Sequence, residues 1–528
     1  MLWLCNKMEL HHLLSWMCLV IVNAGPADRG RNDITLNTEK LNELGSQGQL
    51  LLRHIAITTH SCGIKEQPKF RRKLLRHSPV TCNDGSPAGY YIRKSHGSSK
   101  WIVFLEGGWY CFDRTSCAER YTVMRDVMSS RNWPRHRKAS GILSWDPEEN
   151  PFYFHANMVI VPYCSSDSWS GARNASSRGD FTFMGSLILE EVVKELLKKG
   201  LRNAKKMLVM GSSAGGTGVL INLDRIAKVV KDRAPGVEVR GVVDAGWFLD
   251  NEPYKERHCR DAYTCSPKDG IKKGIEYWQP RLPEDCMARH PSEVWRCYFG
   301  HRIYPSLKTP VFIIQNLYDA AQIKVDNVFE DKGRGSDLSN DQWMYLLQLG
   351  EEIKDTLVNA SAVFAPACVS HDVLTKSEWH TTSIAGVTLA QSIFCWEESN
   401  AGKRQCGKST SNKRKISLMG VNETPLADEP PAGPVYQRRR QKNRKKRRRN
   451  KKKRRKNRGR RGNRDKRAAK SNCKSHLIDS CPWPHCNCSC PKCPWATMAE
   501  VSQYFMKSLA GVMGIDPKKM QNVNLCGY

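Results

Sequence analysis

The sequence has no apolar run long enough to cross a membrane. The apolar run at 13–22 (LLSWMCLVIV) has ten residues, whereas a transmembrane helix needs roughly 20. The sequence also contains no internal repeat, which excludes the stacked-repeat architectures. No later run reaches membrane-spanning length and solenoids are excluded, while 528 residues with 40% hydrophobic content predict a large globular core.

The first residues have the pattern of a secretory signal. Lys7 precedes the apolar run, and Ala24 follows it as a small residue at a cleavage point, so we expect a signal peptide over 1–24. An uncleaved anchor or a buried strand is the alternative. The 21 cysteines fit disulfides in an oxidising compartment, and 19 remain once Cys5 and Cys18 leave with the signal. A secreted protein is predicted, with candidate glycosylation sites at Asn174, Asn359, Asn422 and Asn487.

Acidic residues are almost absent from one stretch, which carries most of the net charge of +32. Residues 438–470 contain 23 Lys and Arg and one Asp, so +22 of the charge lies there. The surrounding segment 398–472 is poor in apolar residues and is predicted to be a disordered insert. In a secreted chain the basic run 438–467 favours heparan sulfate or another glycosaminoglycan as partner, not nucleic acid. A solvated linker or a processing site is the alternative.

The remaining chain alternates between strand and helix patterns. Short apolar runs that end at turn residues predict strands, and apolar residues at helical spacing predict helices. Strands are expected at 100–108, 157–164, 206–211, 239–246 and 309–319, and helices at 184–201 and 217–232. This order predicts an α/β fold with a mostly parallel sheet and helices on both faces.

These patterns also divide the chain into parts. Residues 25–74 are expected to be a loose arm or pro-region, 75–397 a catalytic domain, and 473–528 a cysteine-rich C-terminal segment with a tail. In that last segment Cys490 and Cys493 form a C-x-x-C pair. Disulfides are favoured there over zinc, because zinc needs four well-placed ligands and a secreted chain is oxidising.

The stretch VMGSSAGGTG (209–218) contains the motif G-x-S-x-G with Ser213 at its centre. A predicted strand ends just before it and a predicted helix starts just after it, as in a nucleophile elbow. Ser213 is therefore the candidate nucleophile, and a merely structural tight turn is the alternative. Ser212 does not sit at the right offsets between the glycines.

A serine nucleophile needs a base and an acid, which follow it along the chain in this type of fold. Asp319 ends the apolar strand VFIIQNLYD and is the first candidate for the acid, with Asp244 in reserve and Asp326 less well placed. His371 and His380 both follow Asp319. His371 stands among small residues and a cysteine, which suits a fixed loop, whereas His380 begins an exposed stretch.

Glycines after an early strand predict an oxyanion site. In LEGGWYC (105–111), Gly107, Gly108 and Trp109 can direct backbone N–H groups at a carbonyl oxygen, and Ala214 supplies a further N–H. A simple turn of the chain is the alternative.

Several stretches resemble one family of secreted carboxylesterases. They are FLEGGWYCF, NMVIVPYCSSDSWSG, GSSAGGTGVLINLDR, GWFLDN, APACVSH and SCPWPHC, which cover roughly 75–396 and 473–486. The family is that of the pectin acetylesterases, which includes enzymes that remove palmitoleate from Wnt proteins. The insert at 398–472, the extra cysteines Cys488, Cys490 and Cys493, and the last 30 or so residues depart from its pattern.

The resemblance implies an α/β-hydrolase fold, disulfides between the body cysteines, and a Ser213, Asp319, His371 triad. It implies Gly108, Trp109 and Ala214 as oxyanion donors. It also implies an apolar pocket for a lipid tail, lined by Trp109, Tyr110, Phe248, Ile271, Tyr298, Phe299, Ala321 and Val325.

Three functions follow as hypotheses. The first is a secreted esterase that hydrolyses palmitoleate esters on Wnt proteins, with no cofactor and no metal. The second is a carbohydrate O-acetylesterase of the pectin type. The third is a non-catalytic secreted protein that binds heparan sulfate through 438–467.

Overall fold

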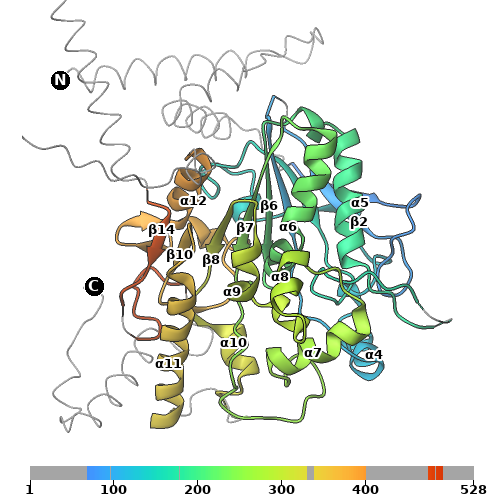
Figure 1. Cartoon of the computed structure of the whole chain (residues 1–528). Helices are drawn as coiled ribbons and strands as arrows, with labels where there is room; N and C mark the ends of the chain where they lie inside the picture. The colour runs from blue at the N-terminus through green and yellow to red at the C-terminus, as the bar shows by residue number, and fades with distance from the viewer. Residues whose placement is uncertain are drawn as a thin grey trace, which may run out of the picture. The chain divides into compact units, whose positions relative to one another are not determined.

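A computed structural model describes residues 68–329, 338–399 and 474–491, except His96, Ser176, Arg178 and Pro482. The predicted signal peptide, most of the predicted arm, the basic run 438–467 and the tail lie outside the described residues. The described part folds around one large sheet with flanking helices (Figure 1). None of its helices has the length and apolar character that a membrane span requires.

The sheet has ten strands among the described residues, in the order β14-β10-β8-β7-β6-β3-β5-β2-β1-β4. The seven strands from β14 to β5 are parallel, and β2, β1 and β4 extend them as an antiparallel edge. The strands are β1 Phe70–Leu74, β2 Gly89–Arg93, β3 Lys100–Leu105, β4 His136–Arg137, β5 Asn157–Val161, β6 Lys206–Ser212, β7 Glu238–Asp244, β8 Val311–Ile314, β10 Val363–Ala365 and β14 His476–Ile478.

Two short pairs of strands lie outside this sheet: β9 Tyr318–Asp319 with β11 Val369–Ser370, and β12 Ser383–Ile384 with β13 Val387–Thr388. The α-helices are α4 Arg114–Val123, α5 Gly185–Lys198, α6 Ala214–Arg233, α7 Pro267–Trp278, α8 Glu284–Arg289, α9 Gly300–Ile303, α10 Ala320–Val325, α11 Asn340–Leu357 and α12 Leu389–Glu398.

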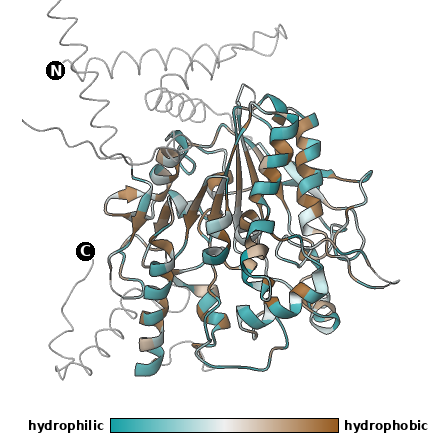
Figure 2. Cartoon of the chain, viewed as in Figure 1, coloured by the Kyte–Doolittle hydropathy of each residue, from teal (hydrophilic) through white to brown (hydrophobic). Residues whose placement is uncertain are grey.

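The predicted α/β class is confirmed, because the expected strands and helices all form and most of the sheet is parallel. The expected strand at 309–319 is divided into β8 and β9. The central strands are buried and apolar, while the covering helices turn their hydrophilic sides outward (Figure 2). Two strands lie outside the part predicted as the catalytic domain: β1, just before residue 75, and β14, after the insert.

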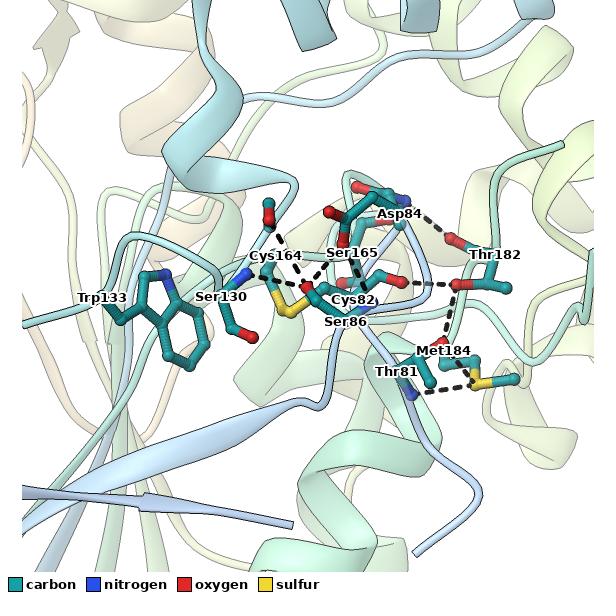
Figure 3. Close-up of a disulfide and its surroundings, with 12 residues drawn as sticks. Thr81, Cys82, Asp84, Ser86, Ser130, Trp133, Cys164, Ser165, Thr182 and Met184 are labelled. Atoms are coloured by element: carbon teal, nitrogen blue, oxygen red, sulfur yellow. Dashed lines mark hydrogen bonds between the residues drawn. A yellow bond between two sulfur atoms is a disulfide. The ribbon is translucent and has the colours of Figure 1, made fainter. Parts of the chain in front are cut away.

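Six disulfides join pairs of described cysteines, which confirms the prediction of disulfides. Cys82–Cys164 connects the chain before β2 to the chain that leaves β5 (Figure 3). Around it, the Ser130 N–H donates to Ser86 Oγ at 2.9 Å and Thr182 Oγ1 donates to the Cys82 carbonyl at 2.7 Å. The Cys82–Cys164 disulfide fixes the start of the segment that runs from Cys164 towards the candidate active site.

Candidate active site

Ser213 occupies a sharp turn between β6 and α6. Its φ of 59° and ψ of −126° lie in a region that non-glycine residues rarely adopt, so the backbone is strained there. The turn is possible because its neighbours lack side chains: a Cβ on Gly211 would lie 2.3 Å from the Gly215 carbonyl oxygen. A Cβ on Gly215 would lie 2.1 Å from the Leu105 carbonyl oxygen. The glycines of the motif therefore let β3, β6 and α6 approach closely and expose Ser213 at the edge of the sheet.

Ser212 has a different environment from Ser213. Its side chain is buried, and its Oγ donates a hydrogen bond of 2.6 Å to Asp244 Oδ2. Ser213 is partly exposed and lines a pocket. Of the two adjacent serines, only Ser213 is therefore placed where a substrate can reach it.

Asp319 and His371 are hydrogen-bonded to each other. The His371 Nδ1 atom lies 3.0 and 2.9 Å from the two carboxylate oxygens of Asp319. A two-residue parallel bridge, in which Ser370 pairs with Asp319, aligns the two loops. Asn316 strengthens the junction, because its Nδ2 donates to the His371 carbonyl at 2.6 Å. These contacts leave Nε2 of His371 as the ring nitrogen that faces away from the carboxylate.

The Asp319 carboxylate is itself fixed from several sides. It is fully buried and caps α10 by accepting from the backbone N–H groups of Ala321 and Gln322 at 2.9 and 3.1 Å. Gln315 Nε2 donates to its other oxygen at 3.3 Å. A carboxylate held in this way can orient one tautomer of the imidazole and stabilise its protonated form.

The charge on this carboxylate affects the pKa of His371. Burial is the strongest influence and lowers the pKa, but the charge of Asp319 and its hydrogen bond raise it. The carboxylates of Asp372 and Asp244 add to the increase, and the net pKa lies above the ordinary value of 6.5.

His380 and Asp326, which were also candidates from the sequence, have other partners than Asp319 and His371. His380 bonds through Nδ1 to the Ser377 carbonyl at 3.0 Å. Asp326 is buried among amides and accepts from Gln322 Nε2 at 3.0 Å and from Asn251 Nδ2 at 3.2 Å. Burial raises its pKa to about 7.

Asp244 joins the turn that holds Ser213 to the loop that holds His371. Its Oδ2 accepts from Ser212 Oγ and also from the backbone N–H groups of Val373 and Leu374, both at 3.0 Å. Its backbone carbonyl accepts the Ser213 N–H at 2.8 Å. Burial and the nearby Asp372 raise the pKa of Asp244 to about 6. The reserve acid of the sequence analysis is thus a link between two loops, and its carboxylate does not contact the imidazole.

The glycine-rich loop after β3 lies directly against Ser213. A Cβ on Gly107 would be 2.8 Å from the Ser213 Cβ and 3.4 Å from the Ala214 nitrogen. Gly108 and Trp109 follow with φ values of 145° and 60°. In the described part of the chain, the backbone N–H groups of Gly108, Trp109 and Ala214 donate no hydrogen bond. Three unsatisfied donors beside a serine hydroxyl are the chemistry of an oxyanion site.

Ser213 also borders an apolar pocket. The pocket encloses about 510 Å³, including space open to solvent. Seven of the eight predicted lining residues take part: Trp109, Tyr110, Phe248, Ile271, Tyr298, Phe299 and Val325. Ala321 is buried but is not among the lining residues. The Phe248 ring centroid lies 6.1 Å from that of His371, which brings the pocket wall next to the imidazole.

Four further residues line this pocket: Ser168, Ala214, Thr217 and Pro267. Ala214, which the sequence predicts only as an oxyanion donor, also lines the pocket. Thr217 could have been found from its spacing, because it lies four residues after Ser213 and therefore on the same face of α6. Ser168 and Pro267 carry no such local signal, since separate loops bring them to the pocket.

Two of the candidate glycosylation sites, Asn174 and Asn359, are exposed, and Asn422 lies outside the described residues. The side-chain nitrogen of Asn487 already donates to the Ser383 carbonyl at 2.9 Å and to Asp479 Oδ2 at 2.6 Å. Cys490 is joined to Cys368 in a disulfide, so its sulfur is not free to bind zinc.

Comparison with known proteins places this chain in a family. The model of the pectinacetylesterase family matches residues 67–419. The palmitoleoyl-protein carboxylesterase NOTUM of Mus musculus is 40% identical over 481 residues, which cover 89% of this chain and 83% of the relative. The chain belongs to the Notum group of the pectinacetylesterase family.

Other members of the Notum group are similar over shorter spans. The protein of the same name from Homo sapiens is 42% identical over 443 residues, covering 83% of this chain and 77% of the relative. The protein of the same name from Drosophila melanogaster is 45% identical over 341 residues, which cover 63% of this chain and 49% of the relative. The resemblance predicted from the sequence, to carboxylesterases of the pectin acetylesterase family, is confirmed.

We expect Gly211→Ala to disrupt the turn, because the new methyl group would meet the Gly215 carbonyl oxygen at 2.3 Å. The melting temperature should fall, and a fluorophosphonate probe should label Ser213 much more slowly. Gly236→Ala is the matched control, since nothing lies within 4 Å of a Cβ at that position. Equal melting temperatures and labelling rates for the two variants would contradict the packing described for the turn.

Proposed function

We propose that this chain is a secreted serine carboxylesterase that hydrolyses the palmitoleate ester on a serine of Wnt proteins and so reduces Wnt signalling. The observation that carries the proposal is the apolar pocket that has Ser213 in its wall. Membership of the Notum group, whose relatives are named palmitoleoyl-protein carboxylesterases, supports the ester and the acyl group. The disulfides and the signal pattern support secretion.

In the proposed reaction His371 accepts the proton of the Ser213 hydroxyl while Ser213 Oγ attacks the acyl carbonyl carbon. The carbonyl oxygen becomes an oxyanion and is stabilised by the N–H groups of Gly108, Trp109 and Ala214. The bond to the serine oxygen of the substrate then breaks, and His371 returns the proton to that oxygen. Water, deprotonated by His371, attacks the acyl-enzyme in the same way and releases palmitoleic acid and free Ser213. Asp319 holds the imidazole in one tautomer throughout.

The pocket favours a long acyl chain over the acetyl group of a pectin-type substrate. Nine of its lining residues are aromatic or otherwise apolar: Trp109, Tyr110, Ala214, Phe248, Pro267, Ile271, Tyr298, Phe299 and Val325. Each buried CH₂ contributes about 0.8 kcal/mol, so a lipid tail gains binding free energy there that an acetyl group cannot. Carbohydrate O-acetylesterase activity is therefore the second candidate.

Association with heparan sulfate through the basic run 438–467 is a separate proposal. A second basic surface exists on the described body, where β1 pairs with β4 at the edge of the sheet. The segments 69–77 and 131–138 that meet there contain no acidic residue. The basic run carries more charge than this edge, so we propose that it dominates binding.

Ser213→Ala should lower the rate of ester hydrolysis by as much as ~10⁶, because it removes the nucleophile. The wild type should hydrolyse p-nitrophenyl octanoate with a higher kcat/KM than the acetate, and should release palmitoleate from an acylated Wnt peptide. A fluorophosphonate probe followed by peptide mapping should locate the label on Ser213. Ser212→Ala is the matched control and should still be labelled.

Preference for the acetate ester would favour the carbohydrate esterase instead. Unchanged hydrolysis by Ser213→Ala would exclude both esterase hypotheses and leave the binding protein.

The pH profile should show an acidic limb set by His371. The imidazole must be neutral to accept a proton, so kcat/KM should fall as the pH drops through its pKa, which lies above 6.5. Asp319→Asn removes the charge that raises this pKa, so the limb should move to lower pH and kcat should fall by up to ~10⁴. His380→Asn should leave the limb in place. A limb that stays fixed in Asp319→Asn argues against His371 as the base.

Deletion of 438–467 should abolish retention on a heparin column at physiological salt without affecting esterase activity. The comparison variant changes Arg71, Arg135 and Lys138 to serine at the sheet edge, and it should elute only slightly earlier than the wild type. If the sheet-edge variant loses more heparin retention than the deletion does, the binding site lies on the folded body instead of the basic run.

A further inference from the structure

Arg120 is a buried cation beside the glycine-rich loop. Only 5% of its surface is exposed, and no carboxylate pairs with its guanidinium among the described residues. Burial lowers its pKa, and the nearby hydroxyls of Tyr163 and Tyr263 oppose that change only in part. A buried charge without a counterion costs free energy, so its position requires an explanation beyond packing.

The chain directs Arg120 to this position by a short covalent and helical link. Trp109 is followed closely by Cys111, which forms a disulfide with Cys117 on α4. Arg120 lies three residues after Cys117 and therefore on the same, buried face of the helix. The cap of α4 at Asp113, which accepts the Ser116 N–H at 2.7 Å, fixes where that helix begins.

Besides a long hydrogen bond of 3.7 Å to Met124 Sδ on its own helix, the guanidinium makes two hydrogen bonds that fix it against the loop. One of its terminal nitrogens donates to the Gly108 carbonyl oxygen. Its Nε donates to Ser166 Oγ at 2.9 Å. Ser166 is itself held, because its carbonyl accepts the Cys111 N–H at 3.2 Å and it follows closely after Cys164, the disulfide partner shown in Figure 3.

The Gly108 carbonyl belongs to the same planar peptide unit as the Trp109 N–H. A cation that bonds to the oxygen draws electron density from the nitrogen side, so the N–H becomes a stronger donor. In a site of low dielectric constant, the same positive charge also favours negative charge on a substrate oxygen that accepts the Trp109 N–H. A neutral donor could hold the loop, but it would give less of this polarisation and none of the charge.

We propose that Arg120 is a positioning residue of the oxyanion site, which fixes the Gly108–Trp109 peptide and polarises its N–H towards the oxyanion. The proposal rests on the proposed function, in that Trp109 must donate to the oxyanion formed at Ser213. It assigns to Arg120 an effect on the transition state and little effect on substrate binding.

Arg120→Met should lower kcat for p-nitrophenyl butyrate about tenfold and change KM by less than twofold. The loss should be smaller than the ~10²–10³ that follows removal of an oxyanion donor, because the N–H itself remains. The affinity for an alkyl trifluoromethyl ketone, which forms a tetrahedral oxyanion with a serine, should fall by the same factor as kcat/KM. Arg120→Lys keeps the charge and should recover more of the rate than the neutral donor in Arg120→Gln.

The matched control is Arg93→Met. Arg93 on β2 is also a buried arginine without a carboxylate partner among the described residues, and it donates to Met158 Sδ at 2.8 Å, away from the loop. That variant should lose stability but keep the wild-type kcat. A wild-type kcat in Arg120→Met overturns the proposal, and so do equal kcat values for Arg120→Lys and Arg120→Gln. If Arg120→Met does not fold, the comparison of Arg120→Lys with Arg120→Gln decides.

The butyrate ester also separates this inference from the proposed function. A wild type that hydrolyses butyrate but releases no palmitoleate from an acylated peptide contradicts the proposed substrate and leaves the Arg120 comparison valid. A wild type that hydrolyses neither ester overturns both.

Discussion

The close approach of several backbone segments around Ser213 is the constraint on which the rest of the site depends. The end of β3, the end of β6 and the first turn of α6 come so near to one another that a single methyl group on Gly107, Gly211 or Gly215 would overlap a neighbour. The strained φ of Ser213 persists because this packing leaves the chain no other course. The same packing brings the free N–H groups of the glycine-rich loop beside the hydroxyl.

Long-range links then hold the histidine loop in place. Asp244 joins that loop to the turn beside Ser213, and the β9–β11 bridge joins it to Asp319. The segment after the insert adds a third support. It pairs with the sheet through β14, and the disulfide Cys368–Cys490 fastens it next to β11. Residues far apart in the chain therefore act on one imidazole, and the insert interrupts the sequence without separating these parts of the fold.

The local features of the site were predictable because their signals are local. Gly211 lies at the end of β6 and Gly215 in the first turn of α6, and the turn at Ser213 between them is set by sterics within a few residues. Asp319 was predictable from its place at the end of an apolar strand. The choice of His371 over His380 was an inference about loops, and the structure distinguishes them by the hydrogen bonds to Asp319.

Arg120 and Asp244 show where reading the sequence stopped short. Arg120 looks in the sequence like one more basic residue of an amphipathic helix, and its burial depends on the disulfide to Cys111 and on Ser166, 46 residues away. In the sequence, Asp244 is a reserve candidate for the acid, because its strand ends at the same edge of the sheet as the strand before Ser213. Its partners at 373 and 374 come from a loop whose path no local pattern encodes.

The sequence by itself determined the order of the central strands and of α5 and α6, the turn at Ser213, the family and the composition of the basic insert, because each rests on residues that are neighbours in the chain. Only the tertiary structure decided which carboxylate meets His371, which side chains enclose the pocket and which cation faces the Gly108 carbonyl. Those contacts join residues that lie from 12 to more than a hundred positions apart. These contacts depend on how the whole sheet packs, and that packing cannot be predicted from composition or residue spacing.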